Sequence, residues 1–245
     1  MLKILTLLCL LLCNVSIFAQ SQDTQKKASV LEFTEYRQGV GEWPLTYTIT
    51  EDFMRIDDVI DNNSESAPGF VLLDRKQQAI YSVNPEEQQI IKVRSVPVNI
   101  NSPITLKPLL KELPQETDAP KIAGHSARHY QYFINDKLCF DAVSIPGFLT
   151  SDIEALAEFK RILAGQQSQV LSQLPEDVHE ACDLARHTFY PTWILEQGLP
   201  VIEQVFEQQS ENKTLVETRT LTNFKQLRVG EQFFELPDYP VMTVN

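Results

Sequence analysis

Apolar and polar residues alternate with a period of two over most of the chain, and this pattern predicts β-strands. The alternating runs are rich in β-branched and aromatic residues and are separated by turn-forming residues. In the first block we expect strands at residues 28–36, 45–50, 53–57, 70–74, 79–83 and 89–94. Because consecutive short strands joined by short turns usually pair with each other, this block predicts an antiparallel meander.

The strand pattern resumes in two further places. We expect strands at residues 121–124, 127–134 and 138–145, and again at 188–196, 199–207 and 214–227. Between the first two blocks, residues 96–120 carry five of the 14 prolines, so only short regular structure is expected there. Residues 104–113 are interpreted as one or two helical turns.

Residues 151–186 do not follow the period of two. Ser151 and Glu154 form a Ser-x-x-Glu capping box, which predicts the start of a helix of roughly six turns. Its apolar positions recur at helical spacing and form one stripe: Ile153, Leu156, Leu163, Val170, Leu171 and Leu174. A second short helix is expected at 176–185. Because such a stripe must be buried, the sequence predicts a mainly β (α+β) fold, in which a curved antiparallel sheet or half-open β-barrel carries one long amphipathic helix on its concave side.

The first residues resemble a secretory signal. Lys3 precedes an apolar run at residues 4–15, which is too short for a membrane span, and Ala19 is a small residue at the expected cleavage position. We therefore expect residues 1–19 to be removed. A lipoprotein signal is the alternative, because Cys9 and Cys13 lie in this stretch, although each of them follows a leucine.

The remaining chain is expected to have a loose leader at 20–27 and a single domain at 28–245 with the helical insert at 151–186. No later stretch approaches 18 consecutive apolar residues, so we expect no membrane span in the mature chain. The full sequence has 21 basic and 33 acidic residues, and loss of Lys3 leaves a net charge of −13. Such a charge disfavours binding to nucleic acid or to anionic lipid surfaces.

Cys139 and Cys182 are the cysteines that stay after removal of the signal. In an oxidising compartment they are expected to form a disulfide, and two buried free thiols are the alternative. The bond would close a loop of about 42 residues and contribute on the order of 4 kcal/mol through the entropy of the unfolded chain.

Several short passages resemble the periplasmic lipoprotein-carrier superfamily of LolA, LolB, LppX and RseB. Residues 53–57, 71–76 and 80–86 are similar to the strand, strand and Tyr-x-x-x-Pro progression of that group, with Tyr81 and Pro85 at the motif positions. Residues 193–201 and 233–237 are similar to an uncharacterised bacterial branch of the same fold. The resemblance implies a half-open β-barrel with helical cover and a periplasmic location.

Aromatic side chains are the main signal for a ligand site. Most of them are expected in the core, and the alternative is that some line an apolar pocket under the helix. The candidate ligand-binding residues are Tyr130, Tyr132, Leu156, Leu163, Phe189, Trp193 and Phe206.

Candidate catalytic and metal groups are few. His125 and His129 span a junction between a loop and a strand, where a spacing of four does not place them on one face. Cys182, Asp183 and His187 form a nucleophilic site only if Cys182 is free. The oxygen-rich residues 57–65 lack the glycine and the final carboxylate of a calcium loop. We therefore expect no cofactor, metal or catalytic residue.

The sequence favours a periplasmic, non-enzymatic protein that binds a lipid, a lipoprotein acyl chain or another apolar ligand in a half-barrel. The first alternative is an envelope interaction or sensor module, similar to RseB, in which the helix plugs the barrel and an envelope protein is the partner. An uncharacterised enzyme is the second alternative.

Overall fold

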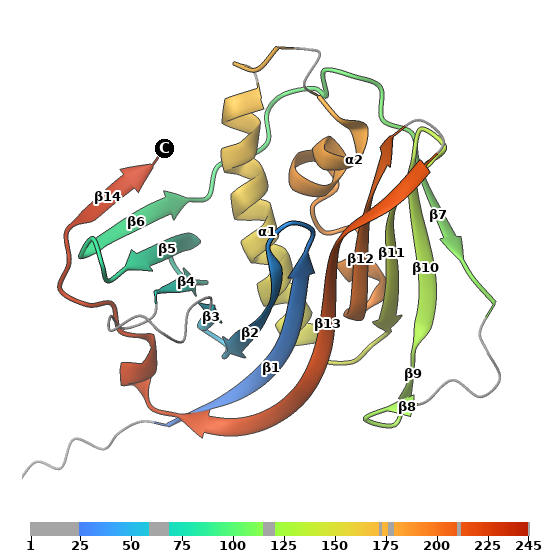
Figure 1. Ribbon diagram of the computed structural model, residues 1–245. Coiled ribbons are helices and arrows are strands. Elements are labelled where there is room, and N and C mark those ends of the chain that lie inside the picture. Colours follow the sequence, from blue (N-terminus) through green and yellow to red (C-terminus); the bar gives the residue numbers. More distant parts are fainter. Residues whose placement is uncertain are drawn as a thin grey trace, which may run out of the picture.

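The computed structural model describes residues 25–58, 69–114, 121–171, 173–175, 179–209 and 212–244, and one twelve-stranded sheet accounts for about half of them (Figure 1). The first strands in the chain are β1 (Lys26–Arg37), β2 (Gly41–Ile49), β3 (Phe53–Asp58), β4 (Phe70–Asp74), β5 (Ala79–Asn84) and β6 (Gln89–Arg94). The later strands are β7 (Pro108–Glu112), β10 (Arg128–Ile134), β11 (Lys137–Ile145), β12 (Leu199–Gln209), β13 (Asn212–Val229) and β14 (Val241–Val244). Two short strands, β8 (Lys121–Ile122) and β9 (His125–Ser126), pair separately.

The strand order in the large sheet is β14-β6-β5-β4-β3-β2-β1-β13-β12-β11-β10-β7. Neighbouring strands are antiparallel, except that β14 runs parallel to β6. The sheet bends strongly along β1 and β13, where the register shifts between Glu32 and Phe33, as expected for a bulge. Since β14 and β7 stay apart at the two ends, the barrel is half-open, as the sequence predicted.

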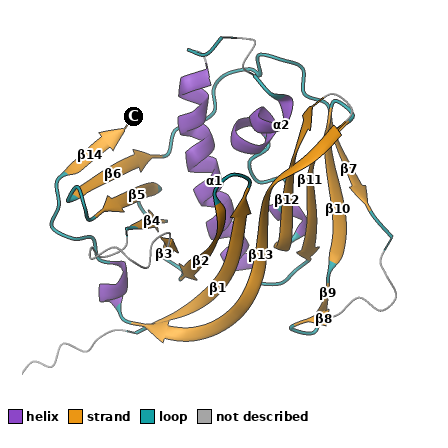
Figure 2. Ribbon diagram, viewed as in Figure 1, coloured by secondary structure: helices purple, strands orange, loops and turns teal. Residues whose placement is uncertain are grey.

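The long helix α1 (Thr150–Leu171) lies on the concave side of this sheet (Figure 2). It is followed by the short helix α2 (Ala181–Leu184), a π-helical turn, η2 (Ala185–Phe189), and the 3₁₀ helices η3 (Leu195–Gln197) and η4 (Glu231–Phe234). The predicted fold class, a curved antiparallel sheet with one long helix on its concave face, is confirmed. None of the helices in the described ranges is long and apolar enough to cross a membrane.

The buried face of α1 differs from the stripe expected from the sequence. Leu163, Val170 and Leu174 are 42%, 48% and 41% exposed, whereas the buried positions of the helix are Asp152, Ala155, Leu156, Ala157, Ile162, Ala164, Gly165, Ser168 and Leu171. Many of these buried residues have small side chains, because the helix backbone lies close to a neighbouring segment of the same chain. The close packing of the helix backbone, and not only the apolar stripe, therefore determines how α1 is rotated about its own axis.

The start of α1 is fixed by polar contacts that replace the expected capping box. The helix begins at Thr150, so Ser151 lies inside the first turn. The next residue, Asp152, is buried and accepts a hydrogen bond from Ser29 of β1. Six residues further along the helix, Glu158 pairs with both Nε and Nη2 of Arg75, at 2.8 and 2.9 Å. These contacts attach the first half of α1 to the sheet.

The second half of α1 contacts the chain that leaves β6. A Cβ built on Gly165 would lie 2.0 Å from the carbonyl oxygen of Val96, and Nε2 of Gln166 donates a hydrogen bond to Arg94 O at 3.4 Å. The backbones of α1 and of this segment are therefore so close at Gly165 that a side chain there would not fit.

Three apolar clusters hold the fold together. The largest fills the space between α1 and strands β1–β5 and includes Leu31, Met54 and Leu73. A second contains Tyr132 and the disulfide between Cys139 and Cys182, whose Cα atoms are 5.3 Å apart. The predicted disulfide is thus confirmed.

The third cluster lies on the opposite face of β3–β6, since side chains alternate between faces along a strand. There Phe53 stacks on Phe234 of η4. The guanidinium of Arg55 lies 3.8 Å from the Phe70 ring and 4.6 Å from the Phe233 ring, and it donates a hydrogen bond to Phe233 O. These contacts fasten the C-terminal segment to the sheet.

Two secondary-structure predictions are wrong. Residues 104–113 contain the strand β7, which pairs with β10, and not a helical turn. Residues 188–196 are not a strand, because the chain continues from α2 through η2 and a turn into η3, and β12 pairs with β11 and β13 instead. In both places tertiary partners override local preference.

The predicted signal at 1–19 and residues 59–65 of the oxygen-rich stretch lie outside the described residues. The range expected to be a loose leader overlaps the sheet, since β1 begins at Lys26.

We predict that Gly165→Ala destabilises the protein. Alanine is favoured over glycine inside a helix by about 1 kcal/mol, but here its Cβ would overlap Val96 O, and overpacking costs about 1–3 kcal/mol. The free energy of unfolding, measured by urea denaturation, should therefore fall. The control is Gln167→Ala, at an exposed position of the same helix, which should change it by less than about 0.5 kcal/mol. An unchanged or increased stability of Gly165→Ala would contradict this packing.

Candidate functional site

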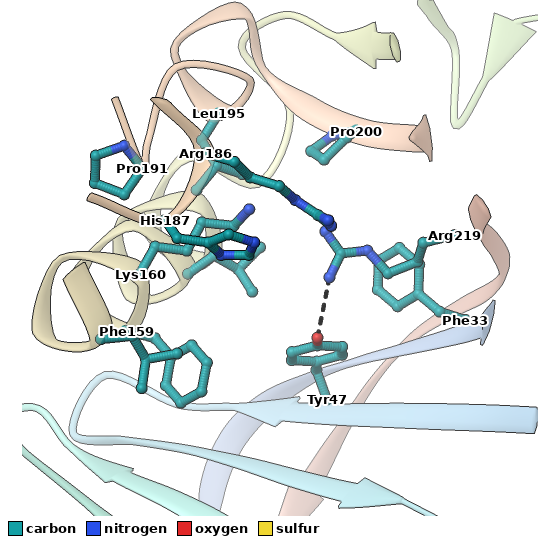
Figure 3. A pocket seen from close by; sticks show the side chains of 12 residues that line it. Phe33, Tyr47, Phe159, Lys160, Arg186, His187, Pro191, Leu195, Pro200 and Arg219 are labelled. Atoms are coloured by element: carbon teal, nitrogen blue, oxygen red, sulfur yellow. Dashed lines mark hydrogen bonds between the residues drawn. The ribbon is translucent and has the colours of Figure 1, made fainter. Parts of the chain in front are cut away.

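A pocket of about 170 Å³ lies between α1, the η2 region and the concave face of the sheet (Figure 3). We call it the α1 pocket. It is lined by Phe33, Tyr47, Leu156, Phe159, Lys160, Leu163, Arg186, His187, Pro191, Leu195, Pro200 and Arg219. Most of these side chains are apolar, and four basic side chains are the exception.

Each wall of the pocket follows from the geometry of its element. Leu156, Phe159, Lys160 and Leu163 follow one another at steps of three, one and three along α1, so they share one face of the helix. Phe33, Tyr47 and Arg219 come from β1, β2 and β13 and point to the concave side. The helix and the sheet thus supply opposite walls.

The third wall comes from the π-helical turn η2. The amide of Tyr190 donates to Ala185 O at 2.8 Å, which is the five-residue spacing of a π-helix. This wider turn carries Arg186 and His187, and Figure 3 shows both side chains directed toward Lys160 and Arg219. Such turns are rare and frequently occur at functional sites.

Behind the basic side chains lies a buried carboxylate. Glu203 of β12 is 2% exposed, its Oε2 pairs with Nη2 of Arg219, and its Oε1 is 3.7 Å from Nη2 of Arg186. Burial favours the neutral acid, but the charges of Arg219, Lys160 and Arg186 outweigh it and hold the pKa of Glu203 well below its usual range. Glu203 is therefore ionised and keeps the basic side chains in place.

The two arginines have further partners. Arg186 donates two hydrogen bonds to Glu217 of β13, one from Nη1 to Oε2 at 3.1 Å and one from Nη2 to Oε1. Arg219 donates from Nη1 to the hydroxyl oxygen of Tyr47 at 3.2 Å. Burial raises the pKa of Tyr47, so its hydroxyl stays protonated. Both guanidinium groups are thus fixed in orientation.

Lys160 differs from the arginines. Within the described part of the chain, its ammonium makes no hydrogen bond and no ion pair, although the side chain is only partly exposed. Burial lowers the pKa of Lys160 from 10.5 to about 8, while Glu203 acts in the opposite direction. At neutral pH it is a cation with three free donor positions.

The mouth of the pocket is marked by two exposed side chains. Leu163 is 42% exposed and His187 is also exposed, whereas Leu156 and Leu195 are buried. A ligand can therefore enter past Leu163.

Of the seven residues expected at a ligand site, the α1 pocket brings together two, Leu156 and Leu163. Phe206 lines a separate groove of about 580 Å³ with a largely charged lining. Tyr130, Tyr132 and Trp193 belong to the second apolar cluster, and the Tyr132 ring packs edge-on against Trp193 at 5.0 Å.

Phe189, the remaining candidate, is the last residue of η2 and does not line the α1 pocket. The basic residues Lys160, Arg186 and Arg219 were missed, because charged residues in an amphipathic segment are usually solvated. The signal that could have located one of them is the spacing of Lys160, which lies four residues after Leu156 and three before Leu163.

The other candidate catalytic and metal-binding residues do not come together in a site. Cys182 is in the disulfide, so the Cys-His-Asp arrangement has no nucleophile. His129 Nε2 lies 2.5 Å from Asp141 Oδ1, and His125 contacts Phe148 instead. Among the described residues, no group of three His, Cys, Asp or Glu side chains could hold a metal ion.

Comparison with known proteins gives matches in structure alone. No protein-family model matches the chain, and no curated protein does. An uncharacterised conserved protein from Thermus thermophilus is similar to it with 8% identity and a TM-score of 0.44, over 91% of this chain and 93% of that one.

Two further solved structures are similar to the chain. The Pseudomonas aeruginosa MucA/MucB complex matches with 10% identity and a TM-score of 0.36, over 86% of this chain and 56% of that one. A LolA superfamily protein from Nitrosomonas europaea matches with 7% identity and a TM-score of 0.29, over 88% and 91%. The described architecture is an open curved sheet with a helix on its concave side, which is a half-open barrel.

We predict that Glu203→Gln lowers the free energy of unfolding by about 3 kcal/mol, because it leaves buried arginine charge without its partner. Urea denaturation of the two proteins at pH 7 measures the difference. Glu32→Gln is the matched control, since Glu32 pairs with Lys225 on the surface and should contribute less than about 1 kcal/mol. Equal effects of the two substitutions would show that Glu203 does not hold the network.

A second prediction concerns pH. The pKa of Lys160 is about 8 in the folded protein and 10.5 without burial, so the unfolded chain binds more protons between these values. Stability should therefore rise with pH over this window relative to Lys160→Met, which lacks the group. The groups around the ammonium are Glu203, Glu217, Arg186, Arg219 and His187.

The measurement is the difference in unfolding free energy between wild type and Lys160→Met from pH 7 to pH 10.5. Because the other titrating groups are common to both proteins, they largely cancel. A difference that does not change with pH would mean that the Lys160 ammonium is solvated like a surface lysine.

Proposed function

We propose that this protein is an exported, non-enzymatic binding protein that holds a small, mainly apolar ligand in the α1 pocket. The observation that carries the proposal is the pocket itself, an apolar space with a few convergent polar groups between a helix and the concave face of a half-barrel. The disulfide between Cys139 and Cys182 supports export to an oxidising compartment.

The size of the pocket supports a compact ligand. Its volume of about 170 Å³ is close to the roughly 150 Å³ of a cavity that binds benzene. Since α1 fills the concave side and is held there by Arg75 and by the contact between Gly165 and Val96, the long acyl chains of a lipoprotein have little room there. A ligand of about the size of one ring, or the end of a chain, suits the space better.

The proposal predicts binding of benzyl alcohol, a neutral ring-sized probe, to the wild-type protein with a Kd of about 1 mM. Leu163→Trp places a large side chain at the mouth and should abolish the binding. The matched control is Val170→Trp, which lies seven residues further along α1, is exposed to a similar degree and does not line the pocket. Chemical-shift titration by NMR measures both affinities.

Binding that survives Leu163→Trp, or that is lost equally in Val170→Trp, would place the ligand elsewhere. Native mass spectrometry of the protein purified from its envelope fraction gives an independent test. A reproducible extra mass that is absent from Leu163→Trp supports ligand carriage, whereas a ligand-free chain with one stoichiometric protein partner would favour the envelope interaction module.

A further inference from the structure

The basic end of the α1 pocket has more positive than negative charge. The side chains that line the pocket include Lys160, Arg186 and Arg219 but, among the described residues, no carboxylate. Glu203 and Glu217 lie behind them and accept hydrogen bonds from the two arginines. The arginines are therefore neutralised from the side away from the pocket.

The third carboxylate near this network has its own partner. Glu35 of β1 is opposite Arg219 in the strand register, and Arg37 Nη2 donates to its Oε1 at 3.3 Å. Glu35 and Arg37 therefore form a pair of their own, and the charged groups that act on one another around Lys160 are three cations, Lys160, Arg186 and Arg219, and two carboxylates, Glu203 and Glu217. One positive charge is left over, and the geometry assigns it to Lys160, which lacks a direct partner in the described chain.

A partly buried ammonium without a partner costs free energy that an anion can recover. Lys160 has three unused donors, and Figure 3 shows its side chain directed toward the space that Arg186, Arg219 and His187 also face. A bound anion there would restore charge balance without displacing Glu203 or Glu217. The single excess charge favours a monoanion over a group with two charges.

The remaining walls determine what the anion must carry. Phe33, Phe159, Leu156 and Leu195 offer contacts to an apolar body and no hydrogen bonds from their side chains. The volume accommodates a body of about one ring. A free inorganic ion would leave these walls uncovered, whereas an acid with a compact apolar body contacts both ends of the pocket.

We propose that the ligand of the α1 pocket is a small monocarboxylic acid whose carboxylate accepts hydrogen bonds from the Lys160 ammonium while its apolar body packs between Phe33, Phe159 and Leu195. The inference rests on the proposed function, because it specifies the chemical class of the ligand at the same site.

The test compares benzoate with benzamide, which has the same shape and no charge. In the wild-type protein, NMR titration at pH 7 should give a Kd for benzoate at least tenfold below that for benzamide. Lys160→Met should reduce the ratio to less than twofold, and the loss should come mainly from weaker benzoate binding. Lys160→Arg keeps the positive charge and should retain most of the preference.

The outcomes distinguish the carboxylate inference from the proposed apolar binding function. If benzamide binds and Leu163→Trp abolishes it, but benzoate gains no preference, the carboxylate inference is wrong and the apolar binding function stands. If benzylamine binds more tightly than benzamide, the pocket selects cations and the inference is also wrong. If none of the three binds to the folded protein, both proposals fail. Thermal unfolding of each variant confirms that it is folded.

Discussion

The buried carboxylate of Glu203 is the interaction on which the concave side of this half-barrel depends. It lies on β12 opposite Arg219 on β13, and its second oxygen faces Arg186 from η2. Without Glu203 the guanidinium of Arg219 would lose its carboxylate partner, and an unpaired buried charge is far more costly than a paired one. Through Arg219 the network also reaches Tyr47 on β2. Glu203 thus joins sheet and helical region at the polar end of the pocket.

The helix α1 completes the pocket as a fixed wall. Its first half is attached through Asp152 and Glu158, and its second half lies against the backbone of Val96 at Gly165. Such attachment favours a preformed site over one that closes on its ligand. A rigid pocket restricts the size of what it can hold, and it limits the entropy lost on binding. The half-barrel is therefore suited to a compact ligand.

The disulfide contributes to the site indirectly. Cys182 belongs to α2, which continues without a break into η2, and η2 carries Arg186 and His187. Cross-linking Cys182 to Cys139 of β11 holds this segment against the sheet, so the positions of both basic side chains depend on it. The same bond removes Cys182 from any nucleophilic chemistry.

The sequence by itself determined the elements whose signal is local. Strands such as β4 and β6 follow from alternation and turn residues, α1 follows from its length and spacing, and the pairing of Cys139 with Cys182 follows from the cysteine count. The helical turn expected before β10 and the strand expected at 188–196 were wrong, because β7 forms through pairing with β10 and η2 through packing against α1.

Only the tertiary structure determines which residues come together around the pocket. Lys160, Arg186 and Arg219 are ordinary charged residues in their own segments, separated by 26 and 33 positions along the chain. Folding places them around one space together with Glu203. The rotation of α1, which puts Leu163 at the mouth, depends on the close approach at Gly165. No local pattern encodes either feature, because both arise from contacts between segments that are distant in sequence.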